Sequence, residues 1–192
     1  MALDFDGIDD RVVHTDIAGI DGASALTFGC WLWIDTSEQN GGIIHKQAAG
    51  VLSFSLQQWY AAPNDRIGCF FNYSTINGGY STTTITTGAW HHWMAVFNGA
   101  GVGNAGRQQL YYDGVAETLT FVGTVPATLP DSGAGTVDTG YVVNGAATTY
   151  YDCKIAHVKI WTAALTAAEV AQEMLTIRPH RTANLTPWSP YD

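Results

Sequence analysis

Apolar and polar residues alternate along much of this chain of 192 residues, and this period of two constrains the fold more than any other feature. Successive side chains of a β-strand point to opposite faces, so such a pattern predicts a strand with one buried face. Over residues 26–34, the positions on one face are all apolar: Leu26, Phe28, Cys30, Leu32 and Ile34. We expect further strands over residues 51–56, 66–73, 90–97, 108–112 and 153–161.

Pairs of Asn or Asp with Gly separate these segments. Glycine adopts the positive φ angles of tight turns without steric cost, and Asn and Asp tolerate them. The pairs stand at Asn40-Gly41, Asn77-Gly78, Asp113-Gly114 and Asn144-Gly145. Many short strands joined by such turns predict an all-β sandwich or barrel, and a chain of this length suits a single domain.

One helix is predicted, near the C-terminal end of the chain. Thr166 and Glu169 have the spacing of a capping box, and Leu165 can pack on Val170 as a hydrophobic staple. Pro179 is expected to end the helix, because the residue before a proline avoids the helical region.

The segment after this helix carries three prolines and no periodicity. We therefore predict a domain over residues 1–177 and a Pro-rich tail over 178–192 that lies outside the fold. Leu185, Trp188 and Tyr191 in this tail would be exposed at a cost in solubility, so we expect them to bind a partner.

The charge balance argues against nucleic-acid binding, and the distribution of apolar residues argues against membrane insertion. There are 8 Lys and Arg residues against 17 Asp and Glu, a net charge of −9. A nucleic-acid-binding protein needs a basic surface to displace counterions from phosphates, and this chain has none. It also lacks a run of 18 apolar residues, so no membrane insertion is expected.

The cysteines and the N-terminus bear on the compartment. Cys30, Cys69 and Cys153 lie within predicted strands without metal-ligand spacing, so we expect buried free thiols. Residues 1–5 begin in a strand-like pattern, with no basic segment followed by an apolar one, and so no signal peptide is expected in this chain.

Five segments, taken in order, resemble a known family. They are a Leu3-Asp4-Phe5-Asp6-Gly7 opening, the strand around Trp31, Trp90-His91-His92 followed by an apolar run, a Leu110-to-Gly114 hairpin, and a closing Lys154-to-Trp161 strand before the capped helix. In order and spacing these are similar to the laminin-G-like jelly-roll family, of the concanavalin A-like lectin/glucanase fold. The resemblance implies a two-sheet antiparallel jelly roll that extends to about residue 176. The chain departs from the family at Ala156-His157, where the closing strand often carries Asp-Glu.

Pattern and resemblance together predict a core. We expect it to include one residue or more from each of the main strands: Phe28, Leu32, Phe54, Trp90, Val96, Leu110 and Ile160.

Catalytic residues are not evident. Glycoside hydrolysis on this fold needs paired carboxylates, and the four glutamates, Glu38, Glu117, Glu169 and Glu173, do not form such a pair on one strand. His91 and His92 are adjacent in a strand, so their side chains point to opposite faces and cannot share a metal ion. We therefore expect that the protein is not an enzyme.

The candidate sites are acidic and aromatic. The resemblance implies a structural calcium ion near the opening strand, with Asp6 and Asp10 as ligands; the alternative is a solvated strand edge. No other cofactor is expected. Trp59, Tyr60, Tyr73 and Tyr80 lie beside turns rich in Asn and Asp, an arrangement on which sugar rings can stack. The alternative is that these four rings cap the open end of the core.

Two functions follow as hypotheses. The first is a non-catalytic recognition module that binds a glycan or a protein surface. The second is a structural or decoration protein on a bacteriophage capsid or tail, where the tail segment would contact neighbouring subunits. Either function implies an extracellular or virion-surface location, and homo-oligomers fit both.

Overall fold

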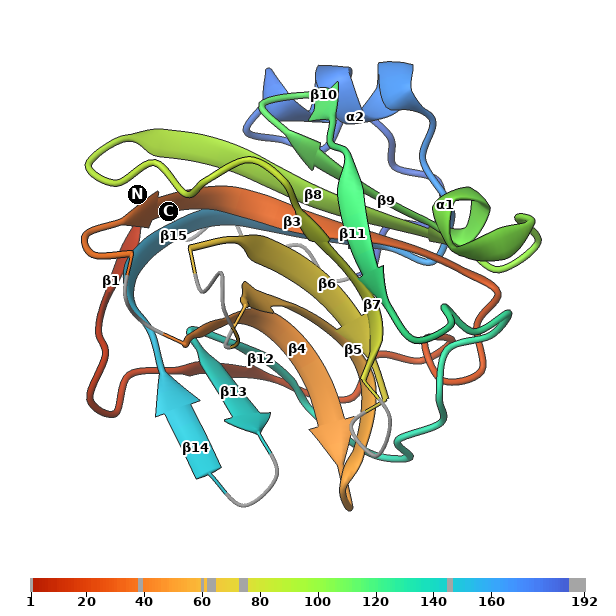
Figure 1. Cartoon of the computed structure of the whole chain (residues 1–192), viewed down its shortest axis with the longest axis horizontal. Coiled ribbons are helices and arrows are strands. Elements are labelled where there is room, and N and C mark those ends of the chain that lie inside the picture. The colour runs from red at the N-terminus through yellow and green to blue at the C-terminus, as the bar shows by residue number, and fades with distance from the viewer. Residues whose placement is uncertain are drawn as a thin grey trace.

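Two antiparallel β-sheets pack face to face in the computed structural model, which describes residues 2–37, 40–59, 61, 65–72, 76–144 and 147–186 (Figure 1). The fold class is therefore the predicted sandwich with jelly-roll architecture. Within the described ranges, no helix has the length and apolar character needed to cross a membrane.

The first sheet has six strands over the described residues. In spatial order they are β1 (Leu3–Asp6), β15 (Asp152–Trp161), β3 (Ala25–Ile34), β8 (Trp90–Asn98), β9 (Gln108–Tyr112) and β10 (Val115–Ala116). We refer to this layer as the six-stranded sheet.

The second layer is the seven-stranded sheet. Its spatial order is β11 (Leu119–Val122), β7 (Asn77–Ser81), β6 (Ile67–Phe71), β5 (Val51–Gln58), β4 (Gly42–Ala48), β12 (Val137–Thr139) and β2 (Val12–His14). A separate hairpin pairs β13 (Tyr141–Asn144) with β14 (Ala147–Tyr150). The helices are α1 (Gly103–Arg107) and α2 (Ala167–Met174), and α2 lies over the six-stranded sheet (Figure 1).

The main core fills the space between the sheets. All five alternating residues of β3, from Leu26 to Ile34, are buried there, as predicted. Phe54, Leu110 and Ile160 join the same core. The three cysteines are buried and free, which confirms the sequence prediction, and burial raises the pKa of the Cys30 and Cys69 thiols.

The prediction for β8 is wrong about which face meets this core. Trp93, Ala95 and Phe97 point between the sheets, whereas Trp90 and Val96 lie on the outer face. Trp90 is only half-buried, and Val96 is buried beneath α2 in a second cluster. Both faces of β8 are apolar because a helix covers part of the outer one, so alternation could not identify the core side.

The capping box of α2 is present as predicted. The hydroxyl of Thr166 accepts a hydrogen bond from the Glu169 backbone N–H, and Glu169 accepts one from Thr166 N–H at 2.8 Å. Leu165 and Val170 are both buried in the second cluster, against Trp161 of β15. The helix start that the sequence encodes thus also fixes α2 to the outer face of the six-stranded sheet.

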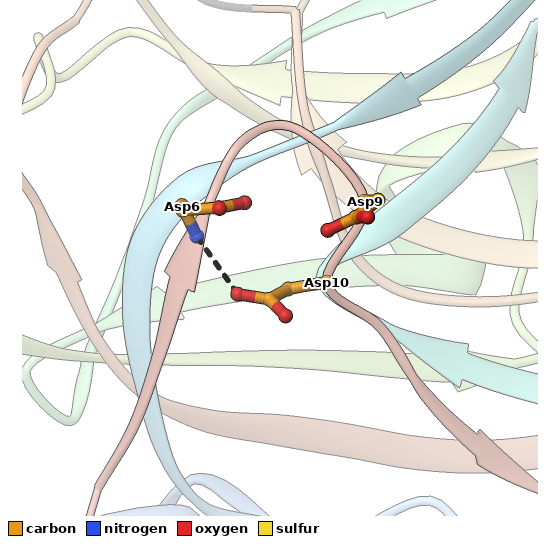
Figure 2. A group of neighbouring side chains, drawn as sticks. All are labelled: Asp6, Asp9 and Asp10. Atoms are coloured by element: carbon orange, nitrogen blue, oxygen red, sulfur yellow. Dashed lines mark hydrogen bonds between the residues drawn. The ribbon is translucent and has the colours of Figure 1, made fainter.

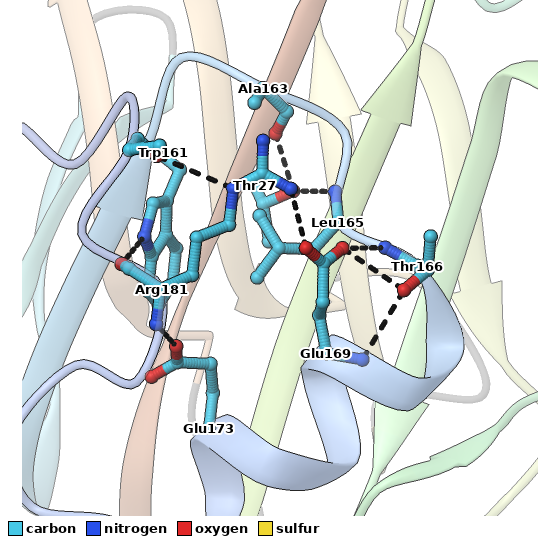
Figure 3. A network of polar contacts seen from close by, with 9 residues as sticks. Thr27, Trp161, Ala163, Leu165, Thr166, Glu169, Glu173 and Arg181 are labelled. Carbon is cyan, nitrogen blue, oxygen red and sulfur yellow. Dashed lines mark hydrogen bonds and ion pairs between the residues drawn. The ribbon is translucent and has the colours of Figure 1, made fainter.

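The prediction of a tail outside the fold is corrected for residues 180–186, which we call the strap. Trp161 Nε1 donates to the Arg181 carbonyl at 2.8 Å, and Thr186 N–H donates to the Ile160 carbonyl at 2.9 Å. Arg181 Nη1 also donates to Glu169 at 2.6 Å (Figure 3). The strap therefore lies along the end of β15 and beside α2. It finds partners there because β1 pairs only with residues 152–155 of β15, and because two glutamates of α2 accept hydrogen bonds from it.

Candidate functional site

Polar side chains from three neighbouring strands meet on the outer face of the seven-stranded sheet. Asp138 of β12 pairs with His45 of β4, His45 with Ser55 of β5, and Ser55 with Phe70 of β6. Alternation places Ile44 and its neighbours in the core, so these residues project the other way. We call Asp138, His45, Ser55 and Phe70 the polar row.

The polar row contains buried hydrogen-bonding atoms that lack partners in the described part of the chain. These are His45 Nδ1, Ser55 Oγ and Asp138 Oδ1. Gln57 Oε1, two residues further along β5 and on the same face as Ser55, also lacks a partner. All four residues are at most 4% exposed. Most buried polar atoms in proteins are hydrogen-bonded, so four such atoms on one face are unusual and identify this row as a candidate site.

Burial disfavours the charged forms of the titratable residues in the polar row. Burial lowers the pKa of His45 to about 4, although a hydrogen bond involving the Tyr141 backbone opposes this shift. Burial also raises the pKa of Asp138. His45 Nε2 and Asp138 Oδ2 are 3.9 Å apart. Because His45 is neutral there, this contact is a polar contact and not a salt bridge.

Serine, histidine and aspartate in one row have the composition of a hydrolytic triad, but their geometry differs. A nucleophilic serine must be hydrogen-bonded to the histidine that takes its proton. Ser55 Oγ and His45 Nδ1 make no such bond to each other or to another described group, and His45 Nε2 faces Asp138. Ser55 and His45 are therefore not arranged as the nucleophile and base of such a triad.

Aromatic rings lie on either side of Ser55 along the row. Trp59 stacks on Phe70, with ring centroids 4.6 Å apart, and on Tyr80, at 5.3 Å and an interplanar angle of 11°. On the other side, the Tyr141 ring is 5.4 Å from His45. Polar atoms between flat rings are what a sugar requires, since it presents hydroxyls at its rim and C–H groups on its faces.

A glycine makes the approach of Tyr141 possible. The β13–β14 hairpin crosses over the start of β4 at Gly42, and a Cβ atom there would lie 2.2 Å from the Tyr141 carbonyl oxygen. Any side chain at this position would push the hairpin away from the sheet. Gly42 therefore sets the distance between Tyr141 and the polar row.

Two of the four predicted aromatic residues belong to the described part of the chain. Trp59 and Tyr80 are brought together, with Trp59 only 5% exposed and Tyr80 half-buried, in a cluster separate from the main core. Tyr60 and Tyr73 lie outside the described residues. The polar row itself was missed, because its members come from distant parts of the sequence. The available signal was a buried-type strand pattern with polar residues at its alternate positions, as in Ser53-Phe54-Ser55-Leu56-Gln57.

The acidic loop after β1 gathers three carboxylates. One oxygen from each of Asp6, Asp9 and Asp10 lies within 4.8 Å of the others (Figure 2). The loop also uses them itself: Asp10 accepts from Asp6 N–H at 3.2 Å, and Asp6 accepts from Ile8 N–H at 2.8 Å. Exposed carboxylate oxygens suit a calcium ion. Asp6 and Asp10 would hold it together with Asp9, and the ion would offset their mutual repulsion.

Of the three predicted partner-binding residues, only Leu185 belongs to the part of the chain that the structure describes. Leu185 pairs with Trp161 in an isolated β-bridge and packs on the second cluster. Trp188 and Tyr191 lie outside the described residues.

Comparison with protein families agrees with this fold. The family model described as the concanavalin A-like lectin/glucanases superfamily, Laminin_G_3, matches residues 6–171. The chain belongs to this superfamily. No curated protein matches this superfamily member significantly.

Solved structures resemble this laminin-G-like domain over almost its full length. A "putative carbohydrate binding protein" from Bacteroides ovatus has a TM-score of 0.74 at 17% identity, covering 99% of this chain and 52% of that one. The heptameric SAP-like pentraxin of Limulus polyphemus has a TM-score of 0.60 at 16% identity, with 98% and 91% covered. Domains LG4-5 of the mouse laminin alpha1 chain have a TM-score of 0.61 at 14% identity, with 98% and 46% covered. The domain thus spans about half of two of these chains, and such low identities show the fold alone.

Proposed function

We propose that this domain is a non-catalytic recognition module that binds a glycan on the outer face of the seven-stranded sheet. The observation that carries the proposal is the polar row, in which unpartnered buried polar atoms lie between the Trp59–Tyr80 stack and Tyr141. Sugar hydroxyls would bond to these atoms, and the C–H faces of the sugar would stack on the rings.

The absence of catalysis is part of the proposal. Glu169 and Glu173 are both engaged by α2 and the strap. Glu117 lies at a turn between β10 and β11, and Glu38 is outside the described residues. Retaining and inverting glycosidases need two carboxyl groups facing one bond at defined separations, and no two glutamates of the described chain face each other in this way across the polar row.

The related structures support a surface role without defining it. The Bacteroides ovatus protein is named for carbohydrate binding, and the Limulus polyphemus protein is a heptamer. We propose an extracellular or virion-surface location and a glycan or protein partner, with homo-oligomers as one form of assembly. The alternative function, a decoration protein of a bacteriophage, stays a prediction.

Replacing Ser55 by alanine should weaken glycan binding about tenfold, since one hydrogen bond to a ligand is worth about 1–1.5 kcal/mol. Tyr80→Ala should weaken it further by removing the half-buried ring of the stack. Binding would be measured by affinity electrophoresis and calorimetry against neutral polysaccharides, including laminarin and xylan. Ser81→Ala is the matched control, because Ser81 is a buried serine of β7, two strands away from Ser55 in the same sheet, and its hydroxyl donates to the Thr83 carbonyl. Unchanged binding in both test variants would refute the location of the site.

Calcium should raise the melting temperature of the wild-type protein if the acidic loop holds an ion. A ligand that binds only the folded state at ten times its Kd adds about 1.4 kcal/mol, or about 3–6 °C for a chain of this size. Asp9→Asn should abolish this shift, and Asp131→Asn, in a distant loop, should leave it intact. Identical wild-type melting curves in calcium and in chelator would remove the ion from the proposal.

A further inference from the structure

Three tryptophans lie on the part of the six-stranded sheet that α2 and the strap leave uncovered. Trp31 and Trp33 belong to β3, and Trp90 belongs to β8. All three are half-buried and point outward, because the residues that alternate with them face the core. We call these three residues the tryptophan face.

A charged network holds one of these rings in place. Trp33 Nε1 donates to Asp35 at 2.9 Å, and Lys154 Nζ donates to the same carboxylate at 2.8 Å. Lys154 Nζ also lies 5.9 Å from the centre of the Trp33 ring and 3.6 Å from Asp4. Trp90 meets Trp33 edge to face, with centroids 6.1 Å apart. Rings fixed in this way lose little conformational entropy when a ligand stacks on them.

A pocket opens beside these rings. It has a volume of about 450 Å³, within the usual range for small-ligand sites, and its wall includes Trp31, Trp90, His157 and Ile177. His157 has a φ of +54° at an irregularity in β15 between Ala156 and Lys159. Bulges re-aim side chains, and non-glycine residues with positive φ cluster at functional sites. This is also where the sequence departs from its family pattern.

We propose that the tryptophan face and its pocket form a second binding site, which takes a neutral glycan chain. The indole rings would stack on the C–H faces of successive hexopyranose rings. The Asp35 carboxylate and the Lys154 ammonium group would bond to their hydroxyls. Asp4 and Asp35, on a domain with a net charge of −9, disfavour anionic sugars such as uronates.

The arrangement of charge favours a glycan over a protein partner. Protein interfaces are depleted of charged residues at their centre. Here Lys154 stands directly opposite Trp33 in the sheet register, so charge and aromatic rings alternate across the surface. Leu175 and Ile177, which are 77% and 58% exposed at the pocket rim, are the feature that a protein partner would use.

This inference rests on the proposed glycan recognition but assigns it a second, opposite surface. The polar row and the tryptophan face lie on the outer faces of different sheets. A domain with both sites would link two glycan chains, and this linkage gives a physical basis for an adhesive role.

The test measures stoichiometry. Calorimetry with neutral oligosaccharides from β-glucan or xylan should give two sites per chain in the wild-type protein, and one site in Trp33→Ala, Trp90→Ala and Ser55→Ala. Each altered site should bind at least about tenfold more weakly, so that a titration at concentrations near the wild-type Kd no longer counts it, and Trp90→Phe should retain binding. Val115→Ala, an exposed change on β10 of the same sheet, is the matched control. Melting curves would establish that each variant is folded. Only proteins with both sites should precipitate the parent polysaccharide.

The outcomes separate this proposal from the first. Loss of one site in the tryptophan variants with no effect of Ser55→Ala would support the tryptophan face and refute the polar row. Full stoichiometry in both tryptophan variants would overturn the second site, as would equal binding of alginate or hyaluronate. A change of oligomeric state on altering Leu175 or Ile177, with glycan binding unchanged in the tryptophan variants, would assign this surface to a protein partner instead.

Discussion

Lys159→Ala should lower the free energy of unfolding by about 3–5 kcal/mol, the usual cost of breaking a buried ion pair. Lys159 Nζ lies 2.9 Å from Glu173 Oε2, and both side chains are almost fully buried. Burial lowers the pKa of Lys159, and the neighbouring Glu173 opposes that shift. Removal of the lysine leaves the Glu173 carboxylate buried without its cation.

The loss extends beyond the pair because three segments meet there. Lys159 Nζ also donates to the carbonyl groups of Glu173 and Thr176, at the end of α2. Glu173 accepts hydrogen bonds from the backbone N–H groups of His180 and Arg181, at the start of the strap. The pair therefore joins β15, α2 and the strap, and its loss should loosen all three.

Denaturant unfolding would measure this effect. Lys154→Ala is the matched control, because it removes an exposed ion pair from the same strand and should cost less than about 1 kcal/mol. The double variant Lys159→Met with Glu173→Gln should recover part of the loss, since no uncompensated charge remains. Equal losses of unfolding free energy in Lys159→Ala and Lys154→Ala would show that the buried pair stabilises the domain no more than the Lys154 pair does.

The sequence predicted the elements better than it predicted which face each element buries. On β3 the alternation has an apolar face and a mixed face, so the core residues could be identified from Leu26 to Ile34. On β8 both faces are apolar, since Val96 lies under α2 and Phe97 lies in the main core. The helix that covers the outer face, α2, is far from β8 in the sequence. The sequence therefore could not show which face of β8 meets the main core, and Trp90 was assigned to the wrong side.

The strap illustrates the same limit. The flanking Pro179 and Pro187 and the lack of periodicity between them correctly exclude a helix or a long strand over the strap. They carry no information on backbone partners, which are the carbonyl of Ile160 and the carboxylates of Glu169 and Glu173. A segment without regular structure can still be held by hydrogen bonds that only the folded domain supplies.

The candidate site combines a local and a non-local part. Trp59 and Tyr80 could be identified because each is an aromatic residue close to a turn. His45, Ser55 and Asp138 become neighbours only through the register of β4, β5 and β12. That register includes two irregularities in the pairing of β4 with β5, which period-two patterns do not encode.

Acid should destabilise the domain strongly between pH 6.5 and pH 4. Burial lowers the pKa of both His45 and His92 from 6.5 to about 4 in the folded protein. The unfolded chain therefore binds more protons in this window, and stability falls as the pH falls. The full stability is present above pH 6.5, and the loss is complete below about pH 4. Each histidine accounts for about 3 kcal/mol, since one pKa unit corresponds to 1.36 kcal/mol.

The surroundings of the two imidazole rings explain why their pKa values are lowered. His45 faces Arg11, which disfavours a second positive charge, and His92 faces Lys159 in the same sense. Asp113 acts in the opposite direction on His92, but burial is the largest cause for both rings. Neither imidazole can be protonated in place without a large cost.

Denaturant unfolding at a series of pH values would test this behaviour. His45→Gln and His92→Gln should each reduce the slope of stability against pH by about half, and the double variant should remove most of it. Ser55→Ala, next to His45 in the polar row, should leave the slope unchanged because it removes no ionisable group. The proposed glycan site contains His45, which stays neutral in the folded protein down to about pH 4, so glycan binding by the folded protein should hold above that pH and weaken below it. A wild-type stability that stays constant from pH 6.5 to pH 4 would mean that the two histidines are solvated, and the polar row would then lose its buried character.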